Sequence, residues 1–345
     1  MNKMLFLLSA SLVVSPAFAA SNNQAASEPQ PNTQASAPDM NEGQQLAYNA
    51  QDKSLSVEQR SEALQQLARF PNTNSLVAVA RALKEPDPAI REAAIVGSEP
   101  YKLEHRWKML APLLEDEVQQ VRFDATANLI RDYRAMAQAQ KDQMEAPTQA
   151  LIDELQQNAK DDEGSQTMLA DVYRWHQEWD KADVIYQKLL TSGDENKNNP
   201  QLWLNYASNK QGQGLDQASI DILDQGLKQL PEDPNLHYAK SLALVRIGKK
   251  ETAANEMQLA ATLAKNNSYY WYLNGVIQQE FNPKLAIGSY QKAYAISGAP
   301  EHLYAVCSLY IQTQDEQTNA CLDELSQVAP KDVVDQLKAN AGIKS

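Results

Sequence analysis

Apolar positions along most of the chain recur at helical spacing, and the helices they predict repeat at two fixed intervals. Between residues 52 and 134 the interval is 31 residues, which aligns Arg60, Arg91 and Arg122 and, three positions later, Ala63, Ala94 and Ala125. From residue 163 onward the interval is near 34 residues. Helical hairpins that recur in this way bury their apolar sides against one another. We therefore expect an all-α protein made of two tandem α-solenoids, without strands.

Each unit of the first array consists of a helix ending in leucine, an acidic turn, and a second helix that opens with an apolar residue and arginine. The two clearest segments read LKEPDPAIREAAI and LLEDEVQQVRFDAT. Glu85 and Asp116 stand six positions before Arg91 and Arg122, and we expect them to form a structural ladder across the turns. The segments resemble short HEAT repeats of the phycobilisome-lyase type, which implies HEAT-like repeats over residues 52–135.

The units of the second array begin at five positions, namely Glu163, Pro200, Pro234, Asn267 and Pro300. Their eighth and twentieth residues are mostly small, and their twenty-fourth is large in the first four units. This is the tetratricopeptide pattern, in which small residues lie where two antiparallel helices cross and a large residue packs between them. The fifth unit is degenerate in its second helix, as expected of a solenoid cap, and a helix over residues 332–339 is expected to complete the domain at 163–345.

Residues 136–162 contain one predicted helix, residues 149–158, which we expect to join the two arrays. At the other end, residues 1–19 combine Lys3, an apolar stretch, Pro16 and a small-x-small cleavage site, the pattern of a secretory signal peptide. The alternative is a membrane anchor, but the apolar stretch is shorter than the roughly 20 residues of a span. Residues 20–51 are polar and predict a disordered linker, with a recognition tail as the alternative.

Composition excludes several classes of function. The chain carries 31 lysines and arginines against 44 acidic residues, a net charge of −13, which argues against nucleic acid as the main partner. Two cysteines cannot build a structural zinc site, and the C-x-x-C-H run of covalent haem attachment is missing. Four scattered histidines and the missing nucleotide and hydrolase motifs give no catalytic, cofactor-binding or metal site. We expect no enzyme activity and no cofactor.

The two cysteines, Cys307 and Cys321, lie on the two helices of the fifth unit, one helical reversal apart. An exported chain meets an oxidising compartment, so this placement favours a disulfide. Two buried free thiols are the alternative.

The tetratricopeptide resemblance implies a concave groove lined by the fifth residue of each first helix. That position holds Thr167, Leu204 and then three aromatic residues, Tyr238, Trp271 and Tyr304. Arg174, Trp175 and Arg246 occupy neighbouring groove positions. Aromatic surface with a few cations suits an extended peptide or an amphipathic helix. Alternatively, these aromatic residues belong partly to the core or are covered by the C-terminal segment.

The order of the two arrays resembles the haem-free C-terminal half of periplasmic multihaem c-type cytochromes. The likeness rests on ALKEPDPAIREAA, APLLEDEVQQVRFDA and GLKQLPEDPNLHYAKSLALVRIGKKETAANEMQLA. Residues 150–230 also resemble the tetratricopeptide subunits of cytochrome c maturation. The sequence thus predicts a periplasmic, non-catalytic adaptor that binds protein or peptide clients through the concave groove. The alternative functions are an assembly factor or chaperone for respiratory proteins or c-type cytochromes, and an enzyme with an unfamiliar site.

Overall fold

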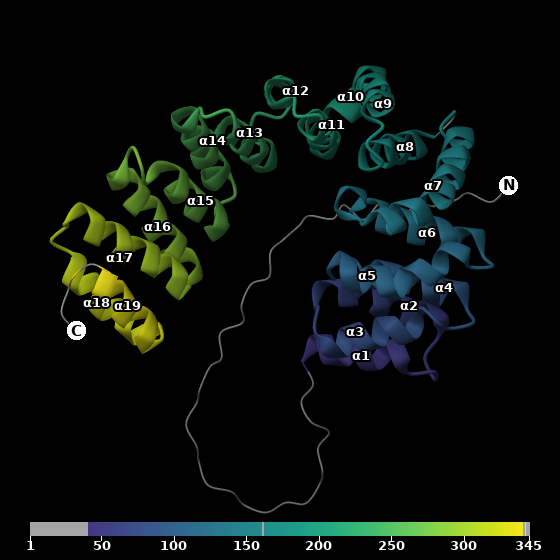
Figure 1. Cartoon of the computed structure of the whole chain (residues 1–345), viewed down its shortest axis with the longest axis horizontal. Coiled ribbons are helices and arrows are strands. Elements are labelled where there is room, and N and C mark those ends of the chain that lie inside the picture. The colour runs from purple at the N-terminus through teal and green to yellow at the C-terminus, as the bar shows by residue number, and fades with distance from the viewer. Residues whose placement is uncertain (1–40, 161, 341, 343–345) are drawn as a thin grey trace, which may run out of the picture. The chain divides into compact units, whose positions relative to one another are not determined.

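The computed structural model describes residues 41–160, 162–340 and 342, and over these residues it contains nineteen α-helices and no β-strand (Figure 1). The all-α solenoid predicted from the sequence is confirmed. The chain divides into two compact units, one ending at His176 and the other beginning at Gln177. The signal peptide predicted at residues 1–19, and most of the linker after it, lie outside the described residues.

The first unit consists of eight α-helices, which are α1 (Glu42–Gln51), α2 (Val57–Gln66), α3 (Thr73–Ala82), α4 (Pro88–Gly97), α5 (Leu103–Leu110), α6 (Gln119–Ile130), α7 (Gln138–Asn158) and α8 (Glu163–Trp175). The arginine-bearing helices α2, α4 and α6 pack in sequence against one another, and α1 packs against α2 and α3. Leu64, Ile90 and Val121 are fully buried in this core. The 31-residue interval therefore corresponds to stacked helical hairpins, and the assignment of these hairpins to the HEAT class stays a prediction.

Helix α1 corrects the predicted linker, because residues 42–51 are helical and belong to the first hairpin. Its N-terminus is capped by Asn41, whose side chain accepts a hydrogen bond from the Gln44 amide while Gln44 bonds back. Ala47 and Ala50 are buried, and the Arg60 Nε donates to the Ala50 carbonyl at 3.1 Å. This helix is absent from the sequence-based prediction because its buried face is made of small residues rather than large apolar ones.

The predicted ladder is present, in a form that links neighbouring units. The carboxylates of Glu85 and Asp116 bind the arginines of the preceding unit, Arg60 at 3.3 Å and Arg91 at 2.8 Å. Arg91 also fixes the turn before its own helix, since its Nη1 donates to the carbonyls of Glu85 and Pro86. Arg122 bonds the Asp116 carbonyl in the same way. Arg91 therefore holds both its own turn and the next hairpin.

The boundary between the arrays differs from the prediction at residue 163. Helix α7 begins at Gln138, eleven residues before the predicted helix, and α8 packs on α6 and α7 within the first unit. Gln156 donates to the Tyr173 hydroxyl at 2.7 Å, and the Tyr133 ring meets the His176 ring edge-on at 4.8 Å. The first helix of the first tetratricopeptide unit is thus part of the N-terminal unit.

The second unit consists of eleven α-helices, which are α9 (Trp179–Ser192), α10 (Asp194–Lys197), α11 (Pro200–Gly212), α12 (Asp216–Gln229), α13 (Pro234–Arg246), α14 (Lys250–Leu263), α15 (Ser268–Gln278), α16 (Pro283–Ser297), α17 (Pro300–Thr313), α18 (Thr318–Val328) and α19 (Lys331–Asn340). Pairs from α11 onward pack as hairpins, and each hairpin packs on the next. The small and large positions predicted to lie between the helices are buried, including Ala253, Met257, Ala286 and Tyr290.

The first helix of the fourth hairpin, α15, is displaced by one residue from the predicted repeat frame, whereas the second helix, α16, keeps it. Asn199, Asp233 and Asn267 are N-caps whose side chains accept hydrogen bonds from the following amides. The first helical residue of this hairpin is therefore Ser268, not Asn267. Counted from Ser268, Trp271 is the fourth residue of its helix, equivalent to the buried Trp203, His237 and Leu303. The fifth position belongs to Tyr272.

When α15 is counted from Ser268, its eighth residue, the small position of the repeat, is Gly275. A Cβ added there would lie 2.5 Å from Tyr290 Cε1, and the Tyr290 ring is held by a hydrogen bond from its hydroxyl to Gln279. We expect Gly275→Ala to destabilise the second unit by about 1–3 kcal/mol, the usual range for overpacking. Gly288→Ala is the matched control, because its Cβ would meet nothing within 4 Å, and it should stabilise α16 by roughly 0.5–1 kcal/mol. Urea denaturation of both variants measures the difference, and equal effects would contradict this packing.

Candidate binding pocket

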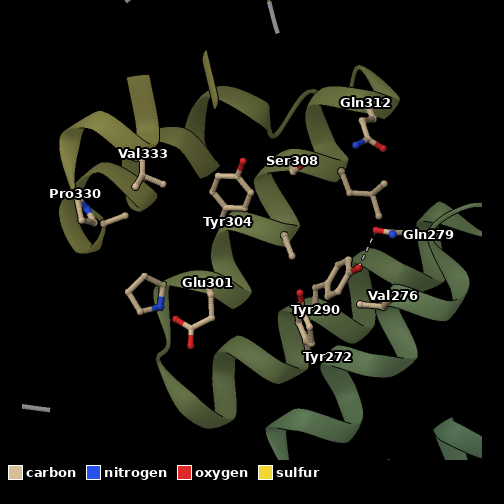
Figure 2. A pocket seen from close by; sticks show the side chains of 14 residues that line it. Tyr272, Val276, Gln279, Tyr290, Glu301, Tyr304, Ser308, Gln312, Pro330 and Val333 are labelled. Carbon is tan, nitrogen blue, oxygen red and sulfur yellow. Dashed lines mark hydrogen bonds between the residues drawn. The ribbon is translucent and has the colours of Figure 1, made fainter. Parts of the chain in front are cut away.

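A cavity of about 600 Å³ lies in the second unit beside α17. One side is made by Tyr272 and Val276 of α15, the floor by α17, and the other side by Pro330 and Val333 where α18 passes into α19. Figure 2 shows Tyr304 between these two sides. Helix α19 is anchored by Val334 and Leu337, which are buried in the core shared with α17. Val333 therefore stays at the pocket, more than one-third exposed.

The aromatic side of the pocket, which includes Tyr272, is held in place by contacts between rings. The Tyr272 ring lies 5.5 Å from the Tyr290 ring and 5.2 Å from the His302 ring. The Tyr290 hydroxyl donates to Gln279 Oε1 at 2.9 Å, a bond drawn in Figure 2. Burial raises the pKa of Tyr290 and lowers the pKa of His302. Both rings are therefore uncharged at neutral pH, and this aromatic side of the pocket carries no formal charge.

The polar groups of the pocket lie on α17 and at its rim. Ser308, Gln312 and Gln279 offer neutral hydrogen-bonding groups, and Glu301 is the one charged residue among those that line the cavity. Glu301 is exposed and lies in the first turn of α17, where a negative side chain is favoured by the helix dipole. The arrangement can bind an apolar side chain and orient the polar chain that carries it.

The predicted groove residues of the second unit have different surroundings. Tyr304 lines the pocket, and Tyr238 is half-buried with its ring stacked on Tyr270 at 4.8 Å. Trp271 corrects the prediction, because it is only 8% exposed and packs in the core with Lys292 Nζ 4.0 Å above its ring. Arg246 donates from Nε to Asp216 at 2.6 Å. Tyr304 is therefore the predicted groove residue that belongs to the pocket.

Arg174 and Trp175 belong to the first unit, whereas the other predicted groove residues, Tyr238, Arg246, Trp271 and Tyr304, belong to the second. Trp175 packs against the core of that unit, and the guanidinium groups of Arg131 and Arg174 lie 5.4 Å and 5.3 Å from its ring centroid. Arg174 also binds Asp171 at 3.1 Å. Both side chains have structural partners in the first unit, so the site is built from residues of the second unit alone.

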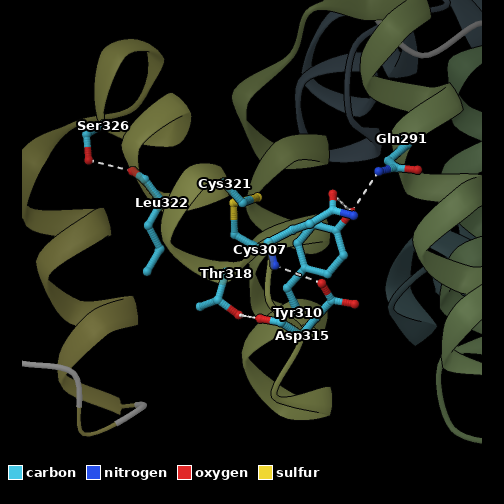
Figure 3. Close-up of a disulfide and its surroundings, with 9 residues drawn as sticks. Gln291, Cys307, Tyr310, Asp315, Thr318, Cys321, Leu322 and Ser326 are labelled. Carbon is cyan, nitrogen blue, oxygen red and sulfur yellow. Dashed lines mark hydrogen bonds between the residues drawn. A yellow bond between two sulfur atoms is a disulfide. The ribbon is translucent and has the colours of Figure 1, made fainter.

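Cys307 and Cys321 are joined by a disulfide, with their Cα atoms 5.5 Å apart (Figure 3). It ties α17, the floor of the pocket, to α18, which leads into the far wall. Both cysteines are buried, and Cys307 takes the small-residue position of its hairpin. The disulfide therefore supports the pocket without lining it.

Several pocket residues are absent from the sequence-based prediction. Tyr272 is missed because the predicted start of its helix, α15, is one residue too early, an error that the N-cap asparagine Asn267 could have revealed. Pro330 and Val333 are missed because they lie in the cap, beyond the repeated units. No periodic signal marks them, and only the packing of α19 brings them to the cavity.

No protein-family model matches the chain, and no curated protein is significantly similar to it. Solved structures similar to it include MamA, at 18% identity over 50% of this chain and 96% of that one, with a TM-score of 0.39. YrrB, described as a tetratricopeptide protein with an unusual peptide-binding site, is 16% identical over 55% and 97% with a TM-score of 0.42. MamA from Desulfovibrio magneticus RS-1 is 15% identical over 52% and 97% with a TM-score of 0.39.

Among the described residues, no helix is long and apolar enough to cross a membrane. These residues also hold no cluster of three or more histidine, cysteine or acidic side chains able to bind a metal ion.

Proposed function

We propose that this chain is a non-catalytic adaptor that binds a peptide segment of a client protein in the pocket beside α17. The observation that carries the proposal is the cavity of about 600 Å³ lined by three tyrosines together with valine, leucine, alanine and proline side chains. Tyrosines supply rigid contact area with a polar tip, which suits peptide recognition. The volume is that of a site for a small ligand or a few side chains.

We also propose a periplasmic location for the protein and a HEAT-like class for its first array. Export to the periplasm is supported by the disulfide, because such bonds persist in oxidising compartments. The first array is proposed to be HEAT-like, which the arginine ladder between successive hairpins supports.

A selection with random peptides displayed on phage tests the pocket. The full chain is immobilised, and selected peptides are then measured by fluorescence anisotropy on the wild type and on Tyr304→Ala. Loss of a central aromatic contact should weaken binding about tenfold or more. Phe281→Ala is the matched control, since Phe281 is an exposed aromatic residue of the same unit outside the pocket.

Circular dichroism is used to confirm that both variants keep their helical content. Peptides that bind the wild type and Tyr304→Ala with equal affinity would refute the pocket as the binding site. A selection that returns no binding peptide would refute the proposed function.

A further inference from the structure

We propose that the pocket selects a basic segment, in which an arginine or lysine stands next to a large apolar side chain. This inference rests on the proposed function and adds the chemical class of the client. The apolar side chain would lie between Tyr272 and Tyr304, and the cation would bind Glu301 at the rim.

The rim of the pocket carries one negative charge, that of Glu301. Glu301 forms no salt bridge within the described part of the chain, although many other acidic side chains there are paired. The basic residue next to the far wall, Lys331, has its ammonium group 2.5 Å from Asp335. The negative charge of Glu301 is therefore available to a ligand, and a cationic group is its natural complement.

The tyrosine rings of the pocket also favour a cation. A guanidinium or ammonium group is attracted to the face of an aromatic ring, and the attraction grows as water is excluded. Tyr272, Tyr290 and Tyr304 line the same cavity as Glu301 (Figure 2). The pocket thus combines apolar volume for one side chain with a ring face and a carboxylate for a neighbouring cation.

The sequence between residues 20 and 41 does not meet this requirement. It contains two acidic residues, Glu28 and Asp39, and neither lysine nor arginine. Binding this segment would place negative charge near Glu301, which is unfavourable. The occupant we propose is a basic segment of a separate client protein. The chain's own Ile343 and Lys344 offer the same chemistry, so a variant without residues 343–345 is included in the test, and a gain in its affinity for an arginine-containing probe would assign the pocket to the chain's own end instead.

The experiment is a methyl NMR titration of the full chain with two probes, N-acetyl-phenylalanyl-arginine amide and N-acetyl-phenylalanyl-glutamate amide. Val276 and Val333 line the pocket, so their methyl signals report binding. We expect the arginine probe to bind about fivefold more tightly than the glutamate probe, the size of one exposed ion pair. In Glu301→Gln the ratio should fall below twofold. In the control Glu251→Gln, which removes an exposed acid outside the pocket, the ratio should be unchanged.

Equal affinity of the two probes in the wild type, or tighter binding of the glutamate probe, would overturn the basic class and leave the apolar pocket proposed above in place. Failure of both probes to shift either valine at 20 mM would also overturn this inference, while the peptide selection decides the proposed function separately. A synthetic peptide of residues 21–40 that shifts the same signals at lower concentration than the arginine probe would assign the pocket to the chain's own segment instead.

Discussion

Arg91→Met is expected to destabilise the first unit by about 3–5 kcal/mol, the usual cost of breaking a buried ion pair. The Arg91 and Asp116 side chains are only 6% and 8% exposed, and their atoms lie 2.8 Å apart. Methionine keeps most of the length and apolar contact of the arginine stem but leaves the Asp116 carboxylate without its partner. It also leaves the carbonyls of Glu85 and Pro86 without their donor.

Urea denaturation followed by circular dichroism measures the change. Lys108→Met is the matched control, because its pair with Glu104 is about 70% exposed on both sides and should contribute within roughly 0.5 kcal/mol. Arg91→Met combined with Asp116→Leu should recover much of the loss, since both charges are then removed. Equal stability of Arg91→Met and Lys108→Met would show that the ladder does not hold the hairpins together.

The same pair gives the stability a dependence on pH. Burial acts to raise the pKa of Asp116, but the hydrogen bonds from Arg91 and the Val118 amide outweigh it and hold the pKa below its ordinary value. A carboxyl whose pKa is lowered by folding contributes stability above its unfolded pKa of about 4, and the contribution is lost as pH falls through the folded value. This loss on acidification should be smaller in Arg91→Met.

The two repeat intervals predict most of the fold because helical hairpins must bury small and large side chains at fixed places. Ala253 and Ala286 lie at helix crossings and are fully buried, as their positions in the repeat predict. The spacing of the arginines and acids likewise predicts a ladder. It cannot show that each carboxylate binds the arginine of the preceding unit, because that choice depends on how one hairpin stacks on the next.

Local features that break the repeat could not be predicted in the same way. Helix α1 buries Ala47 and Ala50, which give a weak apolar signal in a polar segment. The fourth hairpin starts one residue late, so a count from Asn267 selects Trp271 where the pocket has Tyr272. The far wall comes from α19, whose side chains reach the cavity through the packing of a cap that has no counterpart in the other units.

Removing the disulfide with Cys307→Ala and Cys321→Ala is expected to lower the free energy of unfolding of the last hairpin by about 3 kcal/mol. The bond closes a chain segment with a sequence separation of 14, and a loop near 15 residues gives a stabilisation of that size when the unfolded chain is restricted. The eighth residue of α18, Leu325, is fully buried at the place where Leu223, Met257 and Tyr290 fill the core of the other units, so the disulfide adds its stabilisation to this packing at the end of the array.

Hydrogen exchange measured by mass spectrometry should show faster exchange in α18 and α19 of the double variant, with α11 to α14 unchanged, because each hairpin depends mainly on its neighbours. A dithiol reductant should produce the same change in the wild type and none in the double variant. The arginine probe should also bind the double variant more weakly, since α18 leads to Pro330 and Val333 at the pocket wall.

Two free thiols in the denatured, unreduced wild type would contradict the bond itself. Unchanged exchange in α18 and α19 would show instead that the packing of Leu322, Leu325 and Val334 suffices to hold the cap.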